Sequence, residues 1–285
     1  MLLVFLSGCS VNPVTGENQF SLMSAEQEVA IGASNYAPSQ QSQGGRYIID
    51  PEVQAYVSGV GKKLAAVSDR PDLPYEFVVL NNSGPNAWAL PAGYDPSGAV
   101  KLQETFVKLS EGRQQDFLSG LFASHPPSQE RVDANRIKAA TLPKGVINRE
   151  LYQRKIAQIK RDQPAYKAQE AAMKALSADN PKTALSELDK AIAIQPDDGY
   201  FWELRGHAWA MQKNMSNAEQ AFTTAIGKNP DYFSHHLSRG LLRFEEGKKT
   251  AARSDLEKSY QLLPTPYAGY YLGEIALENG DQKNA

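Results

Sequence analysis

The sequence of 285 residues has little of three things: cysteine, long apolar runs and net charge. Because Cys9 is the only cysteine, an intrachain disulfide is impossible, and a structural zinc site built on two or more thiolates is excluded. No stretch approaches the ~18 apolar residues of a membrane-spanning helix. The formal net charge of -2 argues against general nucleic-acid binding. An ordinary globular chain remains, of a length that suits roughly two domains.

Histidine is also scarce, and its spacing excludes one common metal site. The four histidines are His125, His207, His235 and His236. None is four residues from another, as the two ligands of a His-Glu-x-x-His zinc helix must be. Glu203 and His207 are four apart, but two ligands are too few for zinc, so we expect an ordinary polar contact along a helix. His235 and His236 would point about 100° apart on a helix, so they form no joint site.

The start of the chain combines a short apolar run with the lone cysteine. Leu6-Ser7-Gly8-Cys9 resembles a bacterial lipobox, which implies that residues 1–9 are a lipoprotein signal segment and that Cys9 becomes an acylated N-terminus. An apolar terminus with a buried thiol is the alternative. Ser10, rather than Asp, follows the cysteine, and the resemblance then implies the periplasmic side of the outer membrane. The protein would be anchored to the membrane by lipid rather than span it.

Helix-start signals recur through the first half of the chain. Ser24 with Gln27 forms a capping box, and Asp50-Pro51 combines a cap with a proline in the first turn. Asp95-Pro96 predicts a third helix that ends near Gly112, and Ser128 a fourth that runs to about Ala140. Between them, two β-rich stretches predict strands at residues 75–80 and 86–91.

An ordered set of motifs in this half resembles an M48-type zinc metallopeptidase. The set comprises Asn12-Pro13-Val14-Thr15-Gly16, the helix from Asp50-Pro51, the strand 75–80, residues 86–93, Gly93-Tyr94-Asp95-Pro96 and Ser124-His125-Pro126-Pro127 through Arg131. The resemblance implies a zinc enzyme of envelope protein quality control. In such enzymes two histidines and a later glutamate hold the metal, and the glutamate between the histidines activates water.

This chain lacks the segment that carries that chemistry. The gap falls between Gly93 and Tyr94, where an in-frame loss across a short Ala-Gly repeat would produce the sequence seen. We therefore expect zinc for the family but none bound by this chain, and no catalysis. His125 remains as a residue of the metal-side loop, and a solvated loop histidine is the favoured interpretation. Residues 10–145 are predicted to be a truncated α+β peptidase domain with an incomplete sheet.

The second half of the chain is periodic, with a period of 34 residues. Five positions carry the same kind of residue in three successive repeats, and we call each such set of equivalent positions a column. In each column the residue type suits a role in helix packing. The columns are Ala172, Gly206 and Gly240; Ala184, Ala218 and Ala252; Leu188, Phe222 and Leu256; Ala191, Ala225 and Ser259; and Pro196, Pro230 and Pro264. The pattern resembles the tetratricopeptide repeat, in which small residues let paired helices approach and Pro ends the second helix.

The repeats are predicted at 164–197, 198–231 and 232–265, with a partial fourth from Pro266 within a region 164–285. Such stacks bind proteins or peptides in a groove lined by the first helix of each unit. Candidate groove residues are Glu203, His207, Leu237 and Leu241. Trp202, Trp209 and Phe222 could form a ligand box, but packing in the repeat core is favoured.

The sequence thus predicts a mainly α protein: a remnant α+β metallopeptidase domain, a helical connector at 146–163 and an α-helical repeat solenoid. The favoured function is a membrane-anchored periplasmic member of the M48 zinc metalloendopeptidase family that has lost catalysis and binds substrates through its repeats. The alternative is a non-enzymatic, lipid-anchored repeat adaptor that binds protein partners.

Overall fold

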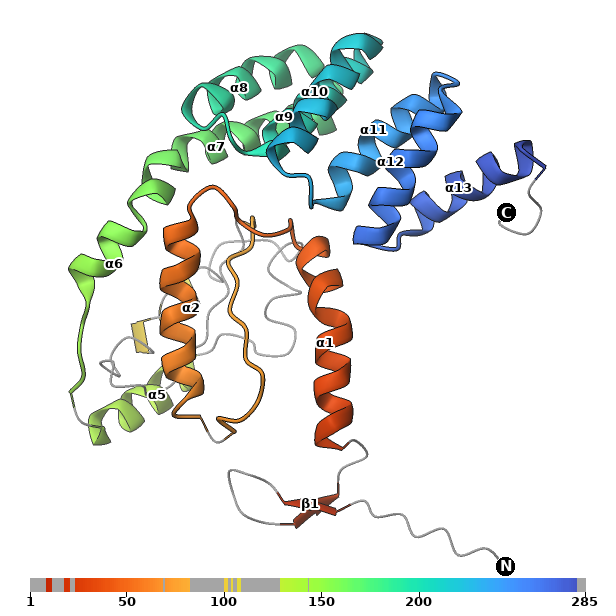
Figure 1. Ribbon diagram of the computed structural model, residues 1–285. Helices are drawn as coiled ribbons and strands as arrows, with labels where there is room; N and C mark the ends of the chain where they lie inside the picture. Colours follow the sequence, from red (N-terminus) through yellow and green to blue (C-terminus); the bar gives the residue numbers. More distant parts are fainter. Residues whose placement is uncertain are drawn as a thin grey trace, which may run out of the picture. The chain divides into compact units, whose positions relative to one another are not determined.

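The computed structural model describes residues 9–11, 18–20, 24–68, 70–82, 100–101, 104, 107–108, 129–142 and 144–280. Over this part the protein is mainly α-helical, as predicted (Figure 1). The chain divides into two compact units. One comprises Met1–Ala30, Ala55–Val78 and Asn82–Arg154, and the other comprises Ile31–Gln54, Val79–Asn81 and Lys155–Ala285. No helix in the described ranges has the length and apolarity needed to cross a bilayer.

Both helix-start signals that can be checked in the first half are confirmed. Helix α1 (Ala25–Ser42) begins with the reciprocal capping box: the Ser24 amide donates to Gln27 Oε1 at 2.8 Å, and the Gln27 amide donates to Ser24 Oγ at 3.2 Å. Helix α2 (Pro51–Ala65) is capped by Asp50, whose Oδ1 accepts from the Glu52 amide at 3.0 Å. In each case a side-chain oxygen satisfies an amide that has no partner inside the helix.

The other helices of the first half agree with the sequence where they can be seen. Helix α5 (Gln129–Thr141) matches the predicted fourth helix, although Ser128, its proposed cap, lies outside the described residues. Val100, Lys101 and Glu104 are helical, as the third helix requires. Two short strands, β1 (Cys9–Val11) and β2 (Asn18–Phe20), pair antiparallel with Cys9 opposite Phe20.

The predicted strand at residues 75–80 is wrong. This stretch is extended, but it pairs with another segment only at one isolated bridge, between Leu80 and Arg46. A β-rich sequence becomes a strand only when another extended segment pairs with it over several residues, and here one point of pairing is made. The second predicted strand, at 86–91, and the loop with His125 lie outside the described residues, as do residues 1–8 of the lipobox segment.

The helical connector and the first repeat share a helix. Helix α6 (Arg149–Lys155) lies inside the predicted connector, and α7 (Ala157–Ser177) runs from the connector into the first repeat. Pro164 lies inside α7, where its missing N–H removes one backbone hydrogen bond without ending the helix. Figure 1 shows α7 as one continuous ribbon.

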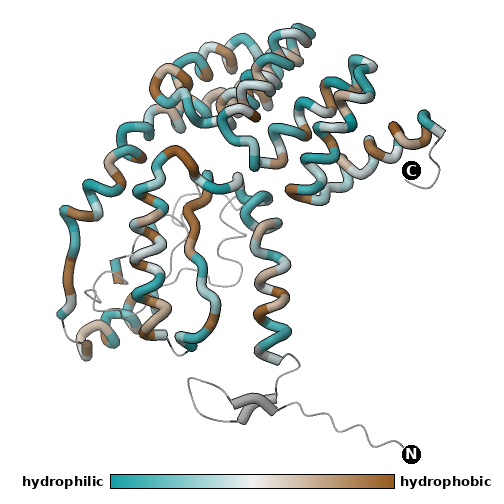
Figure 2. The backbone as a smooth tube through the Cα atoms, in the orientation of Figure 1, coloured by the Kyte–Doolittle hydropathy of each residue, from teal (hydrophilic) through white to brown (hydrophobic). Residues whose placement is uncertain are grey.

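Three helix pairs follow at the predicted places. They are α7 with α8 (Pro181–Ile194), α9 (Gly199–Met211) with α10 (Met215–Lys228), and α11 (Phe233–Glu245) with α12 (Lys249–Leu262). Helix α13 (Pro266–Glu278) is the first helix of the predicted fourth unit. Brown and teal positions interleave along these helices in Figure 2, as expected for helices with one buried side.

The 34-residue columns form the core of the repeats. The alanines of one column, Ala184, Ala218 and Ala252, are fully buried, and Leu188, Phe222 and Leu256 fill the space between paired helices. A Cβ on Gly206 would overlap the Phe222 ring, so only glycine allows α9 to approach α10 this closely. The periodicity thus reflects helix packing, as the sequence predicts.

Candidate protein-binding face of the repeats

Equivalent side chains on the first helix of each repeat define the candidate site. We call this set the first-helix face: Gln169 and Met173 of α7, Glu203 and His207 of α9, and Leu237 and Leu241 of α11, each pair 34 residues from the next. Four of these six are the groove residues predicted from the sequence. Met173 is 40% exposed and the His207 side chain is 45% exposed, so this part of the face is open to a partner.

The side chains of Leu237 and Leu241 are less exposed than those of Met173 and His207. Both are half-buried and pack against the cluster of Ala252, Leu256 and Ile275. Each therefore contributes to the core between α11, α12 and α13 as well as to the face.

Glu203 has a different environment, because it is almost fully buried. Its carboxylate accepts hydrogen bonds from Ser234 Oγ at 2.6 Å and Ser238 Oγ at 3.1 Å and contacts His235 Nδ1. Burial alone would raise the pKa of this carboxyl, but hydrogen bonds from His207 and His235 hold the pKa far below its usual range. Glu203 therefore joins α9 to α11 rather than offering a free carboxylate to a ligand.

His207 and His235 both contact Glu203, whereas His236 has a different partner. His207 Nε2 lies 3.6 Å from Glu203 Oε1, the contact expected for this spacing. His235 faces Glu203, whereas His236 Nε2 lies 2.8 Å from the Pro230 carbonyl oxygen, so the neighbours share no site. Among the residues that the structure describes, no three His, Cys, Asp or Glu side chains gather as metal ligands. The described residues therefore offer no set of ligands that matches the zinc centre implied by the metallopeptidase resemblance.

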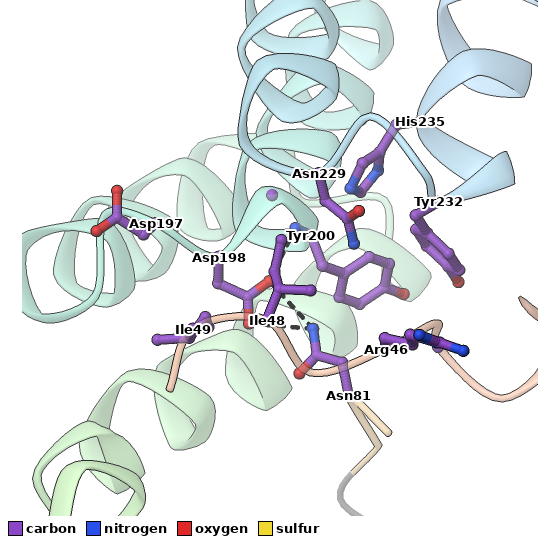
Figure 3. Close-up of a pocket in the computed structure, with 12 residues that line it drawn as sticks. Arg46, Ile48, Ile49, Asn81, Asp197, Asp198, Tyr200, Asn229, Tyr232 and His235 are labelled. Atoms are coloured by element: carbon purple, nitrogen blue, oxygen red, sulfur yellow. Dashed lines mark hydrogen bonds between the residues drawn. The ribbon is translucent and has the colours of Figure 1, made fainter. Parts of the chain in front are cut away.

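A set of contacts at the N-terminal ends of the first helices could not be predicted from the sequence. Asp198, the N-cap of α9, accepts from the Tyr200 amide at 3.0 Å and from Asn81 Nδ2 at 3.2 Å (Figure 3). Asp198 is 3% exposed, and burial raises the pKa of its carboxyl against the opposing effect of these bonds. The aspartate was recognisable as a cap, but nothing in the sequence identifies a partner 117 residues away.

A hollow lies between α9 and α10. It has a volume of about 390 Å³ and is lined by Trp202, Arg205, Trp209, Asn217, Gln220, Ala221 and Thr224. Trp209 also packs against the core cluster of Ala218 and Phe222, and Trp202 Nε1 donates to the Pro196 carbonyl at 3.0 Å. The favoured packing role of these aromatic residues agrees with these contacts.

Comparisons with known proteins identify the repeats. The tetratricopeptide repeat model matches residues 170–233 and 216–269, so this region consists of tetratricopeptide repeats, as the periodicity predicts. The first TPR domain of human RPAP3 is a similar solved structure, 22% identical with a TM-score of 0.40, over 44% of this chain and 98% of that one. MamA is 16% identical with a TM-score of 0.40, over 55% of this chain and 85% of that one. The Arabidopsis OM64 TPR domain is 18% identical with a TM-score of 0.40, over 41% and 98%.

Proposed function

We propose that the protein is a non-enzymatic adaptor that binds segments of other proteins on the first-helix face of its repeats. One observation carries the proposal: Met173 and His207 occupy equivalent positions on two successive first helices, and both are about two-fifths exposed. Stacked helix pairs create such extended faces because each repeat adds one helix to a common surface.

The chemistry of the face favours an apolar or neutral partner. Its only acidic residue, Glu203, is buried and hydrogen-bonded, and the six residues that define the face include no lysine or arginine. Met173, together with Met211 one turn after His207, gives flexible thioether side chains that adapt to differently shaped apolar groups. An acidic peptide would find no cation among these six residues to pair with its carboxylates.

Site-specific photo-crosslinking tests this proposal. A benzophenone amino acid at Met173 or Met211 should crosslink to a partner protein in cells. The same group at Tyr260 should not, because Tyr260 lies on a second helix, α12, at a similar 43% exposure. Equal adducts at all three positions would show that the first-helix face has no special role.

We further propose, from the motifs of the first half, that residues 10–145 derive from an M48-type metallopeptidase and bind no zinc. The support is the ordered motif set together with the missing His-Glu-x-x-His. Lipid anchoring through Cys9 on the periplasmic side of the outer membrane is likewise a proposal, supported by the lipobox-like Leu6-Ser7-Gly8-Cys9. Repeats held near a membrane in this way would present the first-helix face to envelope proteins.

A further inference from the structure

A segment of the chain itself lies at the N-terminal ends of the first helices. Gln41 Nε2 donates to the Asp231 carbonyl at 2.7 Å, and Gln41 Oε1 accepts from the Phe233 amide at 3.0 Å. Gly45 lies against the Tyr232 ring, so close that a Cβ there would be 2.8 Å from Tyr232 Cδ2. This segment therefore contacts the start of α11 directly.

The segment is extended and pairs with a second short stretch. The Tyr47 amide donates to the Val79 carbonyl at 2.8 Å, and the Asn81 amide donates to the Gly45 carbonyl at 2.9 Å. Asn81 then reaches Asp198 at the start of α9 through its side-chain amide (Figure 3). Gln41, in the last turn of α1, and Asn81, in the paired stretch, thus hold the two sides of this extended segment at the starts of two successive first helices.

Tyr47 is the anchor of the segment. It is 7% exposed, and burial, together with the charges of Asp162, Asp50 and Asp198, raises the pKa of its phenol to about 12. Asp162 lies on α7 and Asp198 caps α9, so Tyr47 is close enough to both helices to feel these charges. Tyr166, on α7, is a further neighbour, and its hydroxyl opposes part of this rise in the Tyr47 pKa through a side-chain interaction.

The hydroxyl groups at this anchor are buried and act on one another. The Tyr166 hydroxyl interacts with the Tyr47 phenol and also with the Asp198 carboxylate. The anchor therefore connects the segment both to α7 and to the start of α9.

We propose that the segment 44–49 is a built-in occupant of the partner site, and that partner proteins dock there through an extended stretch with a tyrosine. Such a ligand would place its ring where Tyr47 lies and would then continue along the first-helix face. The face is near, because Gln169 follows Tyr166 by one turn on α7 and Glu203 follows Tyr200 by one turn on α9. The inference rests on the proposed function, because it names the ligand class of the same face.

The test uses the full-length protein and a labelled heptapeptide, Gly-Gly-Arg-Tyr-Ile-Ile-Asp, which copies residues 44–50. The double variant Gln41→Ala/Asn81→Ala loses the side-chain hydrogen bonds to α11 and α9. It keeps the backbone hydrogen bonds that pair the segment with residues 79–81. We expect this variant to bind the peptide at least about tenfold more tightly than the wild type does, measured by fluorescence anisotropy. A peptide with Ala in place of Tyr should bind to neither protein. Gln220→Ala, an exposed change in α10, is the control and should bind as the wild type does.

A second measurement distinguishes release of the segment from a general loss of folding in the variant. Hydrogen exchange at the amides of Tyr47 and Asn81 should accelerate in the double variant, while exchange in α8 and α10 stays as in the wild type. Equal peptide affinity in the double variant and in Gln220→Ala, with this exchange pattern present, would overturn the inference. If crosslinking at Met173 and Met211 then persists, the proposed function stands without it; if those crosslinks are absent as well, both fail.

Discussion

Gln41 caps helix α11 from outside the repeat. Its side-chain carbonyl accepts the Phe233 amide at 3.0 Å, and its amide group donates to the Asp231 carbonyl at 2.7 Å. Tyr232, the residue at the N-cap position, makes no side-chain cap bond of its own. By contrast, Asp198 caps α9 within the repeat. The third repeat therefore depends on a residue of the N-terminal half for a contact that the second repeat supplies itself.

Removal of this external cap should destabilise the protein by a measurable amount. We expect Gln41→Ala to lower the free energy of unfolding by about 1 kcal/mol, the typical loss for an N-cap. Urea unfolding followed by circular dichroism measures the change. Gln220→Ala should stay within about 0.5 kcal/mol of the wild type, as exposed surface changes do. Identical midpoints for the two variants would show that Gln41 adds nothing to the stability of α11.

Two glycines provide a matched test of the helix-packing columns. Gly206→Ala should destabilise the protein by about 1–3 kcal/mol, because the new Cβ overlaps the Phe222 ring and the core is overpacked. Gly227→Ala, inside α10, should be neutral or stabilising by up to about 1 kcal/mol, because nothing lies within 4 Å of its Cβ and alanine favours the helix. Thermal melts of both variants would measure the difference. A Gly206→Ala protein as stable as Gly227→Ala would contradict the packing described.

Asp255 predicts a pH dependence of stability. Its carboxylate binds Arg239 at 2.7 Å and Arg243 at 2.9 Å, with His236 beside it. Burial raises the pKa of Asp255, but these neighbours outweigh it and hold the pKa at about 2, below the usual 3.8. Because the folded-state pKa is depressed, the stabilisation is present above the unfolded pKa and is lost as the pH falls towards 2.

The variant Asp255→Asn should therefore cost about 1–3 kcal/mol at pH 7, because the half-buried Arg239 and Arg243 both lose a charged partner, and Arg243 keeps only Glu219. The difference from the wild type should shrink between pH 4 and pH 2, in urea titrations at each pH. Glu257→Gln removes an exposed pair with Arg253 and should change stability by no more than about 0.5 kcal/mol at any of these pH values. A pH-independent difference for Asp255→Asn would rule out the proposed linkage.

Metal analysis tests the absence of catalytic zinc. The purified protein should contain far less than one zinc per chain and should show no casein hydrolysis above background. The reason is that catalytic zinc needs about three protein ligands and the His-Glu-x-x-His helix is missing. Stoichiometric zinc that survives dialysis would refute this expectation, whichever residues hold it.

Membrane fractionation tests the proposed anchor. Cys9→Ala should move the protein from the membrane fraction to the soluble fraction, because acylation at Cys9 is the proposed attachment. Ser10→Ala is the matched control, since it leaves the cysteine in place, and should stay with the membrane. Retention of Cys9→Ala in the membrane fraction would exclude lipidation as the anchor.

Local signals explain what the sequence could predict. Ser24 with Gln27 and Asp50 with Pro51 each specify a helix start within four residues, and both helices are found. The repeat columns were equally readable, because the same contact recurs in successive repeats: Gly206 lies against Phe222, and Gly240 lies against Leu256. Short-range chemistry of this kind needs no knowledge of the rest of the fold.

Long-range contacts explain what the sequence did not predict. The stretch 75–80 has strand composition, but its pairing depends on how far Arg46 and its neighbours run beside it. Asn81 and Asp198 are 117 residues apart, and no pattern in the sequence joins them. Glu203 was placed on an open groove face from its position in the repeat, whereas Ser234 and His235 of the next repeat cover it. In each case the missing information was the partner rather than the residue.

The most direct measurement of the central claim is the affinity of the crosslinked partner for two matched variants. Met173→Glu/Met211→Glu places two charges on the exposed part of the first helices, and Tyr260→Glu places one on α12 at a similar exposure. If the first helices bind the partner, the double variant should lose at least about tenfold in affinity, while Tyr260→Glu binds as the wild type does. Unchanged binding by the double variant would contradict the account.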